Sequence, residues 1–341
     1  VWEVGGGGVW LNGAVAPDLG MVYFSTGNPV PMFGGELREG DNLFTASVLA
    51  LDMETGERRW HYQVVRHDIW DADIATPVLL YEVVVDGQAR KALAAIRADG
   101  YLFLFDRETG EPLIPIEQRD VPQDARLRTA PTQPFPTKPE PFDRQGLSFD
   151  DLIDFTPELR QEAIEIVSQY KIGPLFTPPT VSRWQGPLAT LMMPSTTGGA
   201  NWGGASFDPE TNMLYLHSTT QVSPLGLVPG GEQSDMDWIR GMVTDPASGT
   251  PPNNGRTAPT VQGLPIVKPP YGRITAYNMN TGNIVWQIPH GETPDEIRNH
   301  PALSGVDIPR TGQVGRGACL LYTSDAADEG LGVDLGGRRI I

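Results

Sequence analysis

The stretch Ser47–Trp60, SVLALDMETGERRW, recurs as RITAYNMNTGNIVW at Arg273–Trp286 and, more weakly, as YLFLFDRETGEPLI at Tyr101–Ile114. Each copy has a run of alternating apolar residues, then Asp or Asn three residues before a Thr-Gly pair. The alternation predicts a strand, and the segment after it predicts a tight turn in which Gly takes a positive φ. We therefore expect the same β-hairpin three times.

A longer repeat relates Trp10–Phe24 to Trp202–Leu216 at a constant offset of 192 residues. At roughly 40 to 50 residues per four-stranded blade, this offset corresponds to about four blades. Repeated small sheets bury both faces only when neighbours stack beside them, which favours an all-β fold of the β-propeller type. A β-sandwich gives no reason for the offset. Trp60 and Trp286 occupy equivalent repeat positions, and we expect both in the core between blades.

Three insertions interrupt the predicted blades. Val121–Phe142 is polar and then Pro-rich, so we expect an extended loop without a strand. Thr156 is predicted to cap one inserted helix, which begins at Pro157 and ends at Gly173. Ser223–Lys268 is rich in Gly and Pro and predicts long loops on one rim. These insertions leave room for about four or five blades.

Composition and charge exclude several classes of protein. Gly and Pro together are about a fifth of the 341 residues, against roughly 12% on average, which rules out a helical bundle. No apolar run approaches the roughly 18 residues of a membrane-spanning helix. The net charge of -17 repels phosphate backbones, so nucleic acid is not an expected partner.

Both ends of the chain look unusual. The sequence starts at Val1 without Met, so we expect a truncation, with any secretion signal upstream. Residues 319–341 resemble the translated end of a sequencing adapter, and a genuine C-terminal segment is the alternative. We therefore expect a partial propeller domain at residues 1–318 and a non-native tail at 319–341. The single Cys, Cys319, falls in this tail, so no disulfide is predicted.

Two groups of polar residues lie where predicted blade strands end. They are Ser25–Pro29 (STGNP) with Gly40–Asn42, and Trp60–Gln63 (WHYQ) with His67–Asp73 (HDIWDAD). Asn and Asp oxygens held on rigid strand ends suit a hard cation such as Ca²⁺, and an adjacent carboxylate can serve as a general base. The alternative for each group is an ordinary capped turn, and composition leaves both alternatives open.

Other motifs point away from competing chemistries. His61 and His67 have no third His nearby, which argues against a zinc site. Gly5–Gly8 lacks the Lys-Ser/Thr of a phosphate-binding loop. No Ser lies in the Gly-x-Ser-x-Gly elbow of a hydrolase.

The motifs taken together resemble a known family. They are STGNP, REGDN, WHYQ, HDIWDAD, DRETG, TQPFPTKP, FTPP and GGANWGG, in the expected order over nearly all of residues 1–318. The chain resembles the quinoprotein dehydrogenases, which bind pyrroloquinoline quinone (PQQ), and is more similar to the membrane-bound glucose dehydrogenase branch than to methanol dehydrogenase. The resemblance implies an eight-bladed propeller, of which this chain would hold a part.

The resemblance also implies the members of a site. Trp10 would stack under the quinone, Asn28 would bind Ca²⁺, and Asp71 would be the catalytic base beside the metal. Asp73 is expected to add a metal ligand, as in relatives that use a lanthanide, so Ca²⁺, a lanthanide and Mg²⁺ all stay open. The implied reaction moves a hydride from the substrate to the quinone while Asp71 takes the hydroxyl proton.

Further cofactor contacts are implied less directly. Asn201 and Trp202 are expected at the edge of the quinone. The family's basic contact falls on Ala98 here, one place after Arg97, so either Arg97 substitutes or the contact is lost. A further calcium ligand would lie upstream of the chain.

These expectations predict a PQQ-dependent dehydrogenase that oxidises an alcohol or an aldose and passes electrons to ubiquinone or a cytochrome. The resemblance implies a periplasmic protein, with any membrane anchor upstream of the chain. The alternative is a non-catalytic propeller scaffold that binds other proteins. A scaffold would keep Trp60 and Trp286 but has no need for Trp10, Asn28 and Asp71 together.

Overall fold

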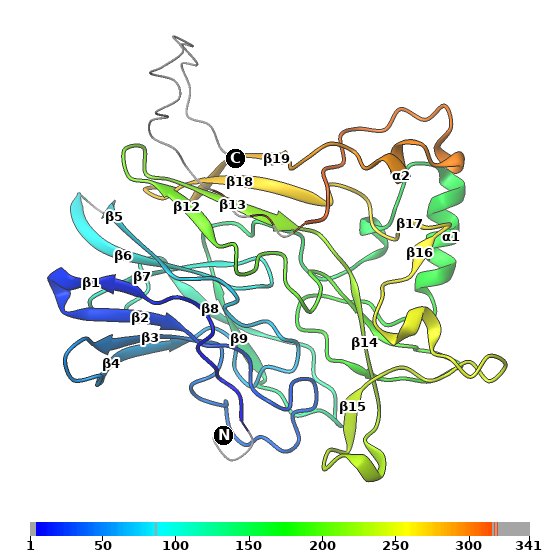
Figure 1. The fold of residues 1–341 in the computed structure, drawn as a ribbon, viewed down its shortest axis with the longest axis horizontal. Helices are drawn as coiled ribbons and strands as arrows, with labels where there is room; N and C mark the ends of the chain where they lie inside the picture. The colour runs from blue at the N-terminus through cyan, green and yellow to red at the C-terminus, as the bar shows by residue number, and fades with distance from the viewer. Residues whose placement is uncertain (1–4, 86, 316, 318, 320–341) are drawn as a thin grey trace.

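Three antiparallel sheets lie side by side in the computed structural model, which describes residues 5–85, 87–315, 317 and 319 (Figure 1). The first sheet contains β1 (Ala14–Ala16), β2 (Met21–Ser25), β3 (Ser47–Asp52) and β4 (Arg58–Gln63). The second contains β5 (Leu79–Val85), β6 (Gln88–Ile96) and β7 (Leu102–Asp106). The third contains β12 (Ala205–Asp208), β13 (Met213–Thr219), β18 (Gly272–Asn278) and β19 (Asn283–Pro289). Neighbours in the chain are neighbours in each sheet, except that a long insertion separates β13 from β18.

The predicted hairpin turn is built in the same way in all three copies. The side-chain oxygen of Asp52, Asp106 or Asn278 accepts hydrogen bonds of 2.9–3.3 Å from the backbone N–H groups two and three residues later. The Gly of each turn has a φ between +67° and +77°. In the weaker copy, an isolated bridge between Phe105 and Pro112 replaces the return strand, because Pro has no N–H for a ladder.

The 192-residue repeat is confirmed in the strand register. Ala14 lies opposite Tyr23 in the first sheet, and Ser206 lies opposite Tyr215 in the third. The offset spans fewer sheets than its length indicated, because the second sheet packs against both of these sheets in the described structure. Residues 107–204 lengthen the chain with a helix, short strands and loops instead. The described residues form these three stacked sheets and a further four-stranded sheet within the insertions.

Two cores fill the spaces between the sheets. Buried side chains of the first and second sheets form one, and those of the second and third sheets form the other. Trp60 lies in the first core, as predicted. Trp286 is only half-buried and packs on Tyr215 of its own sheet, with ring centroids 5.9 Å apart, so the core prediction was wrong there. Both Trp residues lie on end strands of their sheets, but Trp60 also packs on Phe105 of the second sheet, with ring centroids 6.2 Å apart.

Part of residues 121–142 forms a strand, contrary to the prediction. β9 (Thr132–Pro136) pairs with β8 (Ile116–Asp120) in a two-stranded antiparallel sheet. Pro134 and Pro136 are tolerated because each strand of a two-stranded sheet has one open edge that needs no N–H donor.

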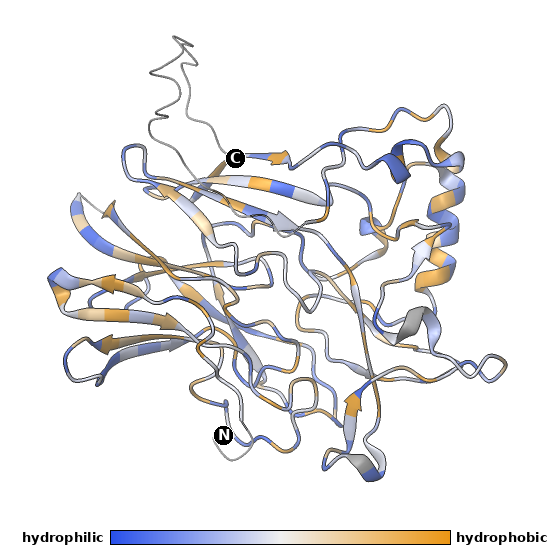
Figure 2. Cartoon of the chain, in the orientation of Figure 1, coloured by the Kyte–Doolittle hydropathy of each residue, from blue (hydrophilic) through white to orange (hydrophobic). Residues whose placement is uncertain are grey.

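Helix α1 (Pro157–Val167) begins as predicted. The Thr156 hydroxyl accepts a hydrogen bond of 3.2 Å from the Leu159 N–H, and Pro157 holds the first position. Apolar and polar bands alternate along α1 in Figure 2, and its apolar face packs on a third cluster of buried residues. The helix ends at Val167, well before the predicted Gly173.

The insertion between β13 and β18 holds strands as well as the predicted loops. β14 (Ser223–Pro229) pairs with β10 (Thr180–Val181), β11 (Thr190–Met192) and β15 (Trp238–Arg240), and β16 (Thr260–Val261) pairs with β17 (Leu264–Pro265). Leu225 and Leu227 of β14 are fully buried. Short helical segments complete the fold: η1 (Pro17–Leu19), η2 (Phe149–Asp151), η3 (Gly231–Gln233), η4 (Pro252–Gly255), α2 (Asp295–Arg298) and η5 (Pro301–Leu303).

Two further features concern the membrane and the tail. Within the described ranges, no helix has the length and apolar character to cross a bilayer. Cys319 is buried, and its carbonyl accepts a hydrogen bond from the Ser206 hydroxyl. Residues 320–341 of the predicted tail lie outside the described residues.

Candidate active site

Asp68 organises the segment HDIWDAD. Its carboxylate accepts three backbone hydrogen bonds, from the N–H groups of Trp70 (2.8 Å), Asp71 (3.0 Å) and Ala72 (2.9 Å). Burial raises the pKa of Asp68, and the three donors favour its charged form in return. The turn that carries Asp71 is therefore fixed by a neighbour in the sequence.

Asp71 is held in an unusual backbone conformation. Its φ is +65°, a region that non-Gly residues seldom occupy and that is enriched at functional sites. Burial, and then the charge of Asp68, raise the pKa of Asp71 to about 7 against the opposing charge of Arg240. A carboxyl with a pKa near neutrality suits a general base.

Asp73 and Asn28 lie next to each other. The Asn28 N–H donates to Asp73 Oδ2 at 2.8 Å. Burial raises the pKa of Asp73 well above its usual range, and the charges of Asp71 and Asp68 add to this. The Asn28 amide donates through Nδ2 to the Pro29 carbonyl at 2.9 Å, and its side-chain oxygen has no hydrogen-bond donor among the described residues.

Gly27 allows Trp10 to lie close to Asp73. A Cβ at Gly27 would lie 3.0 Å from Trp10 Nε1 and 3.3 Å from Asp73 Oδ2, so the three residues pack without spare room. The Gly27 N–H donates to the Gly8 carbonyl at 3.0 Å, which sets the Gly5–Gly8 stretch beside the site. Trp10 remains 52% exposed and offers a flat aromatic face.

The donor set fits a hard cation. The described residues contain no group of three or more His, Cys, Asp or Glu side chains placed to hold a metal ion. A metal here would therefore need the amide oxygen of Asn28 together with Asp71 and Asp73, and mixed amide and carboxylate oxygens are what Ca²⁺ accepts. A cation would also relieve the repulsion between the two carboxylates that raises the pKa of Asp73.

A small cavity of about 30 Å³ adjoins Asp71. Its walls are largely apolar and include Trp70, Phe176 and Met192. The Trp70 indole N–H donates to the Thr177 carbonyl at 3.0 Å, which ties the FTPP motif to this wall. We did not predict these lining residues, and the FTPP motif was the one signal for them.

Asn201 and Trp202 lie in a separate, adjoining pocket. Gly198 lines both pockets, whereas Asp71 lines only the first and Trp202 only the second. The Asn201 side chain is used within its own loop, donating to the Thr197 carbonyl and accepting from the Trp202 N–H. The structure thus places Asn201 and Trp202 in a pocket that shares Gly198 with the Asp71 cavity, but neither residue lines that cavity.

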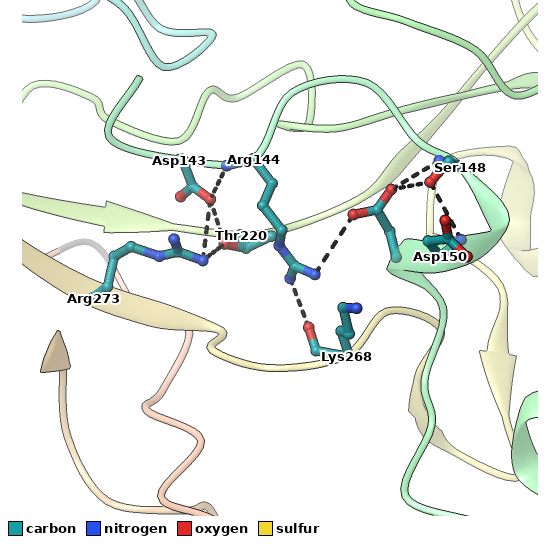
Figure 3. Close-up of polar contacts among 8 residues, drawn as sticks. Asp143, Arg144, Ser148, Asp150, Thr220, Lys268 and Arg273 are labelled. Atoms are coloured by element: carbon teal, nitrogen blue, oxygen red, sulfur yellow. Dashed lines mark hydrogen bonds and ion pairs between the residues drawn. The ribbon is translucent and has the colours of Figure 1, made fainter. Parts of the chain in front are cut away.

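A buried polar network anchors the strand end beside this loop (Figure 3). Asp143 accepts hydrogen bonds from the Thr220 hydroxyl at 2.5 Å and the Arg144 N–H at 2.8 Å. Arg273 Nη2 donates to the Thr220 hydroxyl at 3.1 Å and lies 3.6 Å from Asp143. The neighbouring Thr219 N–H holds the loop through a 2.8 Å bond to the Gly199 carbonyl.

Arg97 occupies a different environment from the one expected of a cofactor contact. Its side chain is fully buried and bonds to Asp99 at 2.8 Å and to the carbonyls of Val64 and Pro134 at 2.8 and 2.9 Å. Four aromatic rings lie within 5.6 Å of its guanidinium carbon. These contacts give Arg97 a structural role in the core, and its contact with a cofactor stays a prediction.

Comparison with known proteins identifies the family. The family model described as PQQ glucose/ethanol/alcohol dehydrogenase, β-propeller domain, matches residues 1–328. The chain belongs to this family. The β-propeller fold of PQQ dehydrogenases therefore accounts for the stacked sheets.

Curated members of the PQQ dehydrogenase family align over most of the chain. Quinate/shikimate dehydrogenase (quinone) of Acinetobacter baylyi is 28% identical, covering 84% of this chain and 36% of the relative. Quinoprotein glucose dehydrogenase of Escherichia coli is 30% identical, covering 84% of this chain and 37% of the relative. The chain thus spans little more than a third of these relatives.

A solved structure supports the same fold. The chain superimposes on a europium-containing methanol dehydrogenase with a TM-score of 0.52 at 20% identity, covering 84% of this chain and 40% of the other. At this identity, the likeness concerns the propeller fold alone.

Proposed function

We propose that this protein is a PQQ- and metal-dependent dehydrogenase that oxidises the CH–OH group of an alcohol, a sugar or a related hydroxy compound. The observation that carries the proposal is that Trp10 and Asp73 both lie against Gly27 and that the Asn28 N–H donates a hydrogen bond to Asp73. A flat exposed indole beside carboxylate and amide oxygens suits a flat quinone with a bound cation.

Each residue would have a defined task at this site. When bound, PQQ supplies a two-electron acceptor and the metal supplies a Lewis acid. Trp10 would stack on the cofactor, and Asn28 and Asp73 would hold the metal with Asp71. Asp71 would accept the substrate hydroxyl proton, because it lines the adjoining cavity and its pKa of about 7 matches that task.

The relatives support parts of this proposal that the chain itself does not specify. One is named for quinate and shikimate and for a quinone acceptor, and another for glucose. We propose a quinone acceptor first and a cytochrome second, and Ca²⁺ first with a lanthanide or Mg²⁺ as alternatives. We also propose a periplasmic location, on the strength of the family resemblance.

The first test is a PQQ titration of the protein followed by tryptophan fluorescence, with and without Ca²⁺. We expect saturable, metal-dependent quenching that Trp10→Ala removes. Trp184→Ala is the control, since Trp184 is similarly exposed at 42% and lies outside the site. Unchanged binding in Trp10→Ala would contradict the assigned site, and no binding by the folded wild type would favour the scaffold alternative.

A further inference from the structure

Arg240 approaches Asp71 from the long insertion. It ends β15 and lies opposite Leu227 of β14. Its guanidinium carbon stands 4.9 Å from the ring centroid of Phe33, which is buried. No motif in the sequence marks Arg240 as a site residue, because it lies in a stretch predicted to be loops.

The loop that starts at Phe33 connects Arg240 to the Asp71 segment. On one side, the Trp238 N–H of β15 donates to Glu36 at 3.3 Å. On the other side, Arg38 donates to the Asp68 carbonyl at 2.7 Å. These contacts tie the strand that carries Arg240 to the turn that carries Asp71, and they do not involve Asp71 itself.

The side chain of Arg240 makes no hydrogen bond or ion pair within the described ranges. Its Nε is buried without a hydrogen-bond partner. The charge of Arg240 lowers the pKa of Asp71, yet the two side chains form no ion pair in the described structure. Arg256 adds a second positive charge nearby. In a chain with a net charge of -17, a half-buried and unpaired guanidinium is a costly arrangement that an anionic ligand would correct.

We propose that Arg240 is a specificity residue that binds a carboxylate of the substrate, so that this protein prefers a hydroxy-carboxylate to a neutral alcohol or sugar. The inference rests on the proposed function, since it places the oxidised hydroxyl at Asp71. Arg suits this task because its planar donors match a carboxylate in two parallel hydrogen bonds and it stays charged when partly buried. The Phe33 ring beneath it orients the guanidinium plane.

Kinetics on a matched pair of compounds test the proposal. The PQQ- and Ca²⁺-loaded protein is assayed with quinate and with its neutral carboxamide. We expect Arg240→Met to lower kcat/KM for quinate roughly 10- to 100-fold, mainly through KM, and to change the carboxamide less than about threefold. Arg240→Lys should recover part of the loss. Arg59→Met is the control, because Arg59 is exposed on β4 and pairs with Asp52 at 3.8 Å.

A binding measurement separates this inference from the proposed function. Calorimetric titration of quinate into the PQQ-free protein should show binding that Arg240→Met weakens by a similar factor. An equal kinetic loss on both compounds would overturn the proposal, because Arg240 would then act on Asp71. A loss of PQQ affinity in Arg240→Met would also overturn it, in favour of a cofactor contact. If the wild type neither binds PQQ nor oxidises either compound, the proposed function fails. The calorimetric titration of quinate into wild type and Arg240→Met then decides by itself whether Arg240 binds a carboxylate.

Discussion

Asp71 is the proposed base, and its replacement gives the most direct prediction at the residue scale. Asp71→Asn keeps the size of the side chain and removes the base, so we expect turnover to fall at least about 100-fold. Affinity for PQQ should change little, because Trp10 supplies the stacking surface. Steady-state rates and the fluorescence titration measure the two effects separately, and an undiminished rate would remove Asp71 as the base.

His217 predicts a pH dependence of stability. Burial, and then the neighbouring His290 with its ring centroid 4.6 Å away, lowers the pKa of His217 to about 4. An unfolded chain binds this proton near pH 6.5, so between about pH 4 and 6.5 the unfolded state holds more protons than the folded state. The free energy of unfolding should therefore fall as the pH drops through this window, by at most about 3 kcal/mol from this group.

Urea denaturation at pH 7, 5.5 and 4.5 checks the His217 prediction. His217→Phe keeps a buried ring without a titrating nitrogen, so the variant should lose less stability on acidification than the wild type. An identical pH dependence in both proteins would contradict the assignment.

At the scale of the element, the repeated turn offers a matched pair of glycines. Gly56 and Gly110 have nearly the same φ, +72° and +77°, but a Cβ at Gly56 meets open space whereas one at Gly110 would lie 2.6 Å from the Trp60 ring. Gly56→Ala should cost about 1 kcal/mol of stability from backbone strain alone. Gly110→Ala should cost more, roughly 2 to 4 kcal/mol, because the buried indole must also move.

Denaturant unfolding of the two glycine variants measures that difference. Equal losses would mean that the Trp60 ring gives way freely. A larger loss in Gly110→Ala would show that the turn of the second sheet also packs on the Trp of the first.

At the scale of the whole molecule, the candidate site joins separate parts of the chain. Trp10 and Asn28 flank the strands β1 and β2 of the first sheet. Asp73 precedes the second sheet, and its carbonyl accepts a 2.9 Å hydrogen bond from the N–H of Ala98, between β6 and β7 of that sheet. A ligand bound across these parts stabilises the folded state by about 2.7 kcal/mol at 100 times its Kd. We expect PQQ with Ca²⁺ to raise the Tm, and Trp10→Ala to remove most of the rise. A Tm that does not respond to saturating ligands would contradict the site.

Local chemistry explains which predictions from the sequence held. The Asx-turns of the hairpins and the Thr156 cap depend on residues a few positions apart, so a short window contains their cause. The strand at Thr132–Pro136 was missed because its pairing partner, rather than its Pro-rich composition, decides it. The 192-residue offset spans fewer sheets than its length indicated, because insertions lengthen the chain between the repeated sheets.

The sequence by itself determined the repeated hairpins and the family, and it predicted Trp10, Asn28, Asp71 and Asp73 as members of the site. Only the tertiary structure decided that Asn28 and Asp73 are bonded across 45 positions, that Arg97 belongs to the core, and that Arg240 stands unpaired beside Asp71. The physical reason is that burial and Coulomb interactions depend on distances in space. Residues far apart in the chain are brought together by the packing of the sheets, so their pairing has no signature in the spacing of the sequence.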